Sequence, residues 1–181
     1  LTLEVKNISE LTYKVFEIDT EAYYKLNKAE LKDSLDLDGL IPNQIKLFTY
    51  GQKKHHRHFE QFDFPEIQNK QRGVFIVEFV GGGMSSRAVL KKGSLTPLIS
   101  PHSQGYQVFI VDEAKKVVKG KKTGLIIDNK FHAVREDGAY VLLPFNETTI
   151  NPQVIVTHEG FSSLATLSMP SESYTLQSEI L

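Results

Sequence analysis

The stretch that most constrains the fold runs from Gly73 to Leu95, with the sequence GVFIVEFVGGGMSSRAVLKKGSL. Residues 73–80 are apolar on both alternating faces except at Glu78, which is typical of a strand in the middle of a sheet. The glycines at 81–83 supply the positive φ angles that tight hairpin turns need. A phosphate-binding loop would require a following helix and a motif such as GK[ST] or GxGxxG, which the stretch lacks. The stretch therefore predicts an antiparallel hairpin.

Alternation of apolar and polar residues with a period of two continues on both sides of this hairpin. It predicts further strands at residues 1–5, 11–18, 44–50, 59–64, 106–112, 123–128, 131–135, 139–145, 153–158, 162–167 and 174–181. Short strands separated by turn residues are the pattern of a β-sandwich. Between Thr20 and Ser34 the pattern changes to a helix-compatible mixture in which Asp19 or Thr20 can cap the first turn.

The chain is therefore predicted to be all-β, with two consecutive antiparallel β-sandwich domains of the fibronectin III-like kind. The first domain, residues 1–94, carries the short helical insertion, and the second covers residues 105–181. The boundary is expected in KKGSLTPLISPHSQG, where two prolines, two glycines and three serines break the periodicity. Residues 95–104 are predicted to be the linker.

Charge and composition exclude several classes of function. With 21 basic and 22 acidic residues, the chain lacks the basic excess that nucleic-acid binding usually needs. No apolar segment approaches the roughly 20 residues that span a bilayer. The absence of cysteine excludes disulfides, thiol nucleophiles and cysteine-ligated zinc. The chain starts at Leu1 in the middle of a strand pattern and without a targeting signal, which suggests a piece of a larger protein.

The histidines around residue 56 are the most conspicuous candidate metal ligands. His55, His56 and His58 lie close to Glu60, and imidazole is a common ligand. Lysine and arginine side chains are interspersed among them, however, and their charge disfavours a divalent cation. A solvated hairpin loop explains the segment better. The lysine run at 115–122 is likewise expected to be a solvated hairpin edge, because it has no aromatic residues for base stacking.

No catalytic constellation is found, so the chain is predicted not to be an enzyme. The serine pairs at 85–86 and 162–163 lie in no GxSxG motif. Asp128 could approach His132 or His158, but no spacing supports a dyad, and His102 has no partner. Two N-x-[ST] glycosylation tripeptides begin at Asn7 and Asn146.

Several segments resemble the macroglobulin-type domains of alpha-2-macroglobulin-like proteins. The segments similar to a first such domain are Tyr13–Asp19 (YKVFEID), Gly73–Glu78 (GVFIVE) and Arg87–Leu90 (RAVL). Those similar to a second are Gln107–Asp112 (QVFIVD), Val117–Gly120 (VVKG) and Asp137–Pro144 (DGAYVLLP). The resemblance implies two consecutive macroglobulin-type sandwiches from a larger protein.

In that family, proteases are trapped through a bait segment and often a thioester formed by Cys and Gln in a C-E-Q motif. This chain has no Cys, so the resemblance implies a non-catalytic scaffold without catalytic, cofactor or metal residues. Its implied partners are neighbouring domains of the parent chain and a protease or another protein. Neither nucleic acid nor a membrane span is implied, and the implied location is extracellular, cell-surface or periplasmic.

A ligand-binding module of a cell-surface or secreted protein, for carbohydrate or adhesion, is the alternative function. Such a module would present exposed aromatic side chains on a flat face or in a groove. The candidates are Tyr23, Tyr24, Tyr50 and Tyr140, in a chain without Trp.

Overall fold

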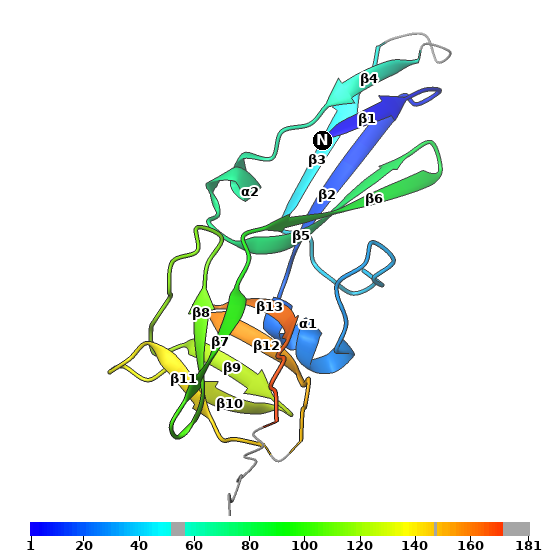
Figure 1. Ribbon diagram of the computed structural model, residues 1–181. Coiled ribbons are helices and arrows are strands. Elements are labelled where there is room, and N and C mark those ends of the chain that lie inside the picture. Colours follow the sequence, from blue (N-terminus) through cyan, green and yellow to red (C-terminus); the bar gives the residue numbers. More distant parts are fainter. Residues whose placement is uncertain (52–56, 147, 172–181) are drawn as a thin grey trace, which may run out of the picture. The chain divides into compact units, whose positions relative to one another are not determined.

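A computed structural model describes residues 1–51, 57–146 and 148–171, and Figure 1 shows its elements. Antiparallel strands dominate the described residues, as the alternating sequence pattern predicts. Contacts between residues divide the chain into two compact units. The first unit consists of residues 1–20 and 30–93, and the second of residues 21–29 and 94–181.

The first unit contains a four-stranded sheet with the order β3-β2-β5-β6 and a two-stranded sheet that pairs β1 with β4. The bounds are β1 Thr2–Val5, β2 Glu10–Ile18, β3 Gln44–Thr49, β4 His58–Gln61, β5 Gly73–Gly81 and β6 Met84–Lys92. A short helix, α2 (Pro65–Asn69), precedes β5 and was not predicted from the sequence.

Tyr13 lies at the centre of the first unit's main core. Alternation along β2 places Leu11, Tyr13 and Val15 on one face, where they pack with Phe62 and Phe64 after β4. Rings of Phe62 and Phe64 meet the Tyr13 ring edge to face, with centroids 6.2 and 5.2 Å away. Burial raises the pKa of the Tyr13 hydroxyl, and the nearby Glu66 carboxylate raises it further. The two sheets therefore form a sandwich around aromatic side chains.

Strand β5 is buried on both faces, as its continuous apolar sequence predicts. One face contributes to the main core, whereas Ile76 on the other packs with Phe16 and Leu37. Leu37 belongs to the segment of residues 30–43 that leads into β3. This segment covers the outer face of the sheet, and Glu78 lies on that covered face.

The glycine triplet forms the β5–β6 turn. Gly81 pairs with Met84, and Gly82 and Gly83 between them have φ angles of 59° and 76°. A two-residue turn with positive φ at both positions is a type I′ hairpin, which matches the twist of the flanking strands. The predicted hairpin is confirmed, because strand β6 follows the glycines.

The second unit contains a four-stranded sheet with the order β10-β9-β12-β13 and a three-stranded sheet with the order β11-β8-β7. The bounds are β7 Thr96–His102, β8 Gly105–Val111, β9 Thr123–Ile127, β10 Lys130–Ala133, β11 Tyr140–Leu143, β12 Gln153–His158 and β13 Phe161–Thr166. Val108 and Ile110 of β8 are fully buried, as are Leu125 of β9 and Val156 of β12, so this unit is also a sandwich. The last predicted strand, residues 174–181, lies outside the described residues.

Helix α1 (Thr20–Asn27) packs on the outer face of the four-stranded sheet of the second unit (Figure 1). Its Tyr24 is 1% exposed and contacts Ile126 and Ile155. The helix ends early because Lys28 adopts a φ of 48°, a left-handed conformation that cannot continue a helix. A helix was predicted over 20–34 as an insertion in the first domain. The structure instead assigns residues 21–29 to the second unit.

The residues predicted as a linker, 95–104, are mostly strand. Strand β7 pairs with β8 along its whole length, from Thr96 opposite Val111 to His102 opposite Gly105. Pro97 and Pro101 fit there because β7 is an edge strand, where a residue without an N–H can point outward. Leu95 just before the strand is buried, and its N–H donates to Ser163 Oγ.

Candidate functional site

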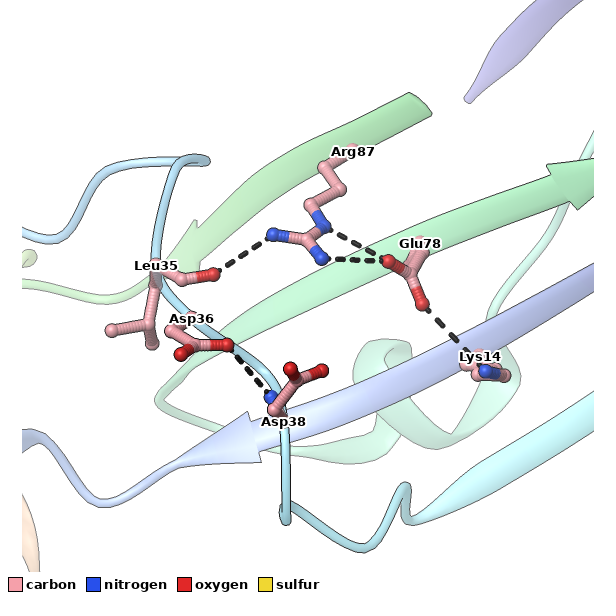
Figure 2. Close-up of polar contacts among 6 residues, drawn as sticks. All are labelled: Lys14, Leu35, Asp36, Asp38, Glu78 and Arg87. Atoms are coloured by element: carbon pink, nitrogen blue, oxygen red, sulfur yellow. Dashed lines mark hydrogen bonds and ion pairs between the residues drawn. The ribbon is translucent and has the colours of Figure 1, made fainter. Parts of the chain in front are cut away.

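A charged cluster lies on the covered outer face of the first unit's sheet (Figure 2). Register places Lys14, Glu78 and Arg87 in one row across the neighbouring strands β2, β5 and β6. Arg87 Nε and Nη2 are each 2.9 Å from Glu78 Oε1, and Lys14 Nζ is 3.8 Å from Oε2. The Glu78 side chain is 10% exposed, and a carboxylate at such a position needs charged partners to offset its lost hydration.

Arg87 also fastens the covering segment to the sheet. Its Nη1 donates to the carbonyl of Leu35 at 2.9 Å. Asp36 accepts a hydrogen bond from the N–H of Asp38 within the same loop (Figure 2), as expected of an Asx turn. The printed contacts of Arg87 and Glu78 thus join the covering segment to the sheet and hold this loop in place.

The predicted histidine segment is only partly described, since His55 and His56 lie outside the described residues. His58 Nε2 is 3.5 Å from Glu60 Oε2 on β4, and the Tyr50 ring lies 5.4 Å from the His58 ring. Burial raises the pKa of the Tyr50 hydroxyl, and Glu60 adds to the effect. Residues 1–51, 57–146 and 148–171 contain no group of three or more His, Asp or Glu side chains that could hold a metal ion.

The structure places the other polar candidates in strands and turns. His158 Nδ1 is 2.7 Å from Thr123 Oγ1 on the neighbouring strand, which accounts for a histidine on an apolar strand. His102 Nδ1 accepts from the N–H of Gln104 at 3.4 Å. Asp128 lies in the turn between β9 and β10 with a φ of 47°. Asn7 is exposed in a turn, whereas the Nδ2 of Asn146 is buried.

Of the four tyrosines proposed for ligand binding, the three in the second unit do not form one aromatic face. Tyr24 is buried under α1, and Tyr23 packs edge to face on it. Tyr140 packs against Phe109 and lies under Arg135 in the three-stranded sheet of the same unit. Tyr50 belongs to the first unit. A flat platform for a sugar ring is therefore not built from these residues.

A cavity of about 450 Å³ lies on the outer face of the second unit's four-stranded sheet, beside α1. Its floor includes Ile126 of β9 and Phe131 of β10. The Phe131 ring lies over Gly124, where a Cβ would approach the ring within 2.7 Å. The remaining wall is polar and is formed by Glu21, Lys25, Lys121, Lys122, Asn129, Thr157, Glu159 and Gly160.

The charges around this cavity are unevenly paired. Glu21 Oε1 accepts from Lys25 Nζ at 2.7 Å, and Glu21 Oε2 accepts from the Thr157 hydroxyl at 3.3 Å. Neither Lys121 nor Lys122 forms an ion pair with any side chain in the described part of the chain. A second cavity of about 290 Å³ shares Lys121 and is also lined by Lys119 and Arg135.

Sequence reasoning missed this pocket, although it noted the lysine run. The pocket joins residues from α1, the approach to β9, the β9–β10 turn and the β12–β13 turn, which are distant in sequence. Only the lysines at 121 and 122 gave a local signal. Their interpretation as a solvated edge accounts for their exposure but not for the cavity beside them.

The fold defines a protein built of antiparallel β-sandwiches. Residues 11–93 match the family model described as "AbpF first immunoglobulin-like domain". The chain is also 33% identical, over 182 residues, to Actin-binding protein F of Dictyostelium discoideum. That alignment covers 97% of this chain and 8% of the relative. The chain therefore corresponds to a small part of that long protein.

Among solved structures, the chain is similar to native alpha-2-macroglobulin from Escherichia coli spanning domains NIE-MG1. The TM-score is 0.47 with 11% identity, over 92% of this chain and 87% of that chain. This likeness is too low to carry an argument. The macroglobulin-type assignment, the protease-trapping role and the extracellular, cell-surface or periplasmic location all stay predictions. In the described residues, no helix is long and apolar enough to cross a membrane.

Proposed function

We propose that this chain is a non-catalytic interaction module of a larger, actin-associated protein. The observation that carries the proposal is the 33% identity to Actin-binding protein F along 97% of the chain. The immunoglobulin-like match over residues 11–93 supports it, because such sandwiches commonly present binding surfaces on a rigid core. The charged cluster around Glu78 also supports it, since its groups are engaged in holding a loop.

Co-sedimentation with filamentous actin tests this proposal. The 181-residue chain is mixed with increasing filament concentrations, and the pelleted fraction is measured. We expect saturable pelleting that exceeds the pelleting of the chain alone and of an unrelated folded protein of similar size and charge. An amide NMR spectrum of the same sample establishes that the chain is folded. A folded chain that stays in the supernatant at a large excess of filaments would contradict the proposal.

A further inference from the structure

We propose that the cavity beside α1 in the second unit binds an acidic peptide segment of a partner protein, with an apolar side chain seated on Phe131. The proposal rests on the interaction role proposed above and names the chemistry of the partner. The volume of the cavity, about 450 Å³, is within the range of small-ligand sites, which is about 300–1,000 Å³.

Charge argues for a carboxylate-bearing ligand. Lys121 and Lys122 line the cavity without an ion-pair partner in the described part of the chain. Lys25 beside them is compensated by Glu21 at 2.7 Å. Two ammonium groups without ion-pair partners at the edge of one cavity attract an anion, although Glu159 in the same wall offsets part of their charge, and each can point a donor toward a carboxylate.

The acceptors in the wall argue for a peptide rather than a phosphate. Glu159 and Asn129 also line the cavity, and Glu159 has no ion-pair partner in the described residues. The Glu159 carboxylate repels any anion placed directly against it, and a phosphate presents mostly acceptor oxygens there at neutral pH. A peptide carries both carboxylates for the lysines and backbone N–H donors for the oxygens of Glu159 and Asn129. Arginine forks, which favour phosphate, do not line this cavity in the described structure, and the first turn of α1 presents the Glu21 carboxylate to it.

Phe131 supplies the apolar contact. Its side chain is 45% exposed although it sits on a sheet face next to the buried Ile126. Gly124 leaves room for the ring in this position, because a Cβ there would meet both the ring and the carbonyl of His132. An exposed ring beside two ammonium groups suits a segment that alternates acidic and apolar residues.

The test uses NMR titration of the full chain with the peptide Glu-Glu-Phe-Glu-Glu, blocked at both ends. We expect amide shifts centred on Asn129, Thr157 and Gly160, and binding that weakens as salt is raised. The Lys121→Gln/Lys122→Gln variant should bind about tenfold more weakly, since each exposed ion pair contributes roughly a factor of three. The control is Lys115→Gln/Lys116→Gln, which removes the same charge from the same lysine run outside both cavities. It should bind like the wild type.

Four results would overturn the inference. They are shifts that lie elsewhere, equal weakening in both lysine variants, equal binding of Gln-Gln-Phe-Gln-Gln, and equal binding of inorganic phosphate at the same amides. The shift map of the wild type decides the location even if a variant fails to fold. Co-sedimentation separates this inference from the proposed function. Pelleting with actin but no peptide binding defeats only the pocket, and peptide binding without pelleting defeats only the actin association.

Discussion

Replacing Arg87 by methionine tests whether the charged cluster of the first unit stabilises it. The substitution keeps an unbranched side chain but removes both contacts to Glu78 Oε1 and the hydrogen bond to the Leu35 carbonyl. Loss of one partner from a buried ion pair costs about 3–5 kcal/mol, because the other charge stays buried. Here Lys14 remains 3.8 Å from Glu78, and the Arg87 side chain is itself 30% exposed. We therefore expect a loss of about 2–3 kcal/mol.

Native-state hydrogen exchange is the suitable assay because the chain has two units, and a global unfolding curve would mix them. Amides of Ile76 and Val77 in β5 should exchange roughly 30 to 150 times faster in Arg87→Met. The double variant Glu78→Gln/Arg87→Met should recover most of the loss, since no charge is then left buried. Amides of the second unit should not change.

Arg57→Met is the matched control for this measurement. Arg57 Nε is 2.8 Å from Glu4 Oε1, but the Arg57 side chain is 64% exposed. Such a surface pair contributes about 0–1 kcal/mol. If Arg87→Met and Arg57→Met change the exchange of β5 equally, burial does not decide the strength of the cluster, and the reasoning fails.

Three further predictions concern the β5–β6 turn, the β10–β11 loop and α1. Gly82→Ala should destabilise the first unit by about 1–2 kcal/mol, because φ is 59° there; Gly51→Ala, in open space, should be near neutral by the same exchange assay. The hydrogen bond from Arg135 holds the pKa of Asp137 below its ordinary value. The ionised Asp137 therefore stabilises the folded chain at pH values above the pKa that this group has in the unfolded chain. This stabilisation is lost as the pH falls through its lower pKa in the folded chain. Arg135→Gln should therefore raise the Asp137 pKa in a carboxyl NMR titration, and an unchanged value would refute the assignment. Tyr24→Ala should cost the second unit about 3 kcal/mol, whereas Tyr23→Ala, which is only partly buried, should cost clearly less; equal losses would contradict the packing of α1.

The strands with strong local patterns could be predicted from the sequence. β5 is a continuous apolar run and β2 alternates along its length, so their residues indicate strand without knowledge of their partners. The glycine turn between β5 and β6 was predictable because few other residues tolerate positive φ.

The elements that were missed lack a local signal. In β7, Pro97 and Pro101 resemble linker residues, and only the pairing with β8 shows that they occupy an edge strand. Helix α2 has five residues, which is too short for a helical period to show. Helix α1 ends at Lys28 because of a positive φ at a non-glycine residue, which the helix-compatible sequence up to Ser34 did not indicate.

The placement of α1 explains why the pocket could not be found along the sequence. Glu21 and Lys25 precede most of the first unit in the chain, yet they belong by contacts to the second unit. A division of the chain at residues 95–104 would assign them to a different domain from Lys121 and Thr157, with which they line one cavity. Tyr24 explains why α1 packs on the second unit, because its side chain is buried against Ile126 and Ile155. This packing stabilises a helix of eight residues, which is too short to be stable on its own. The binding surface is thus a product of tertiary packing, and Tyr24 is the buried aromatic residue through which the short helix that completes it packs on the sheet.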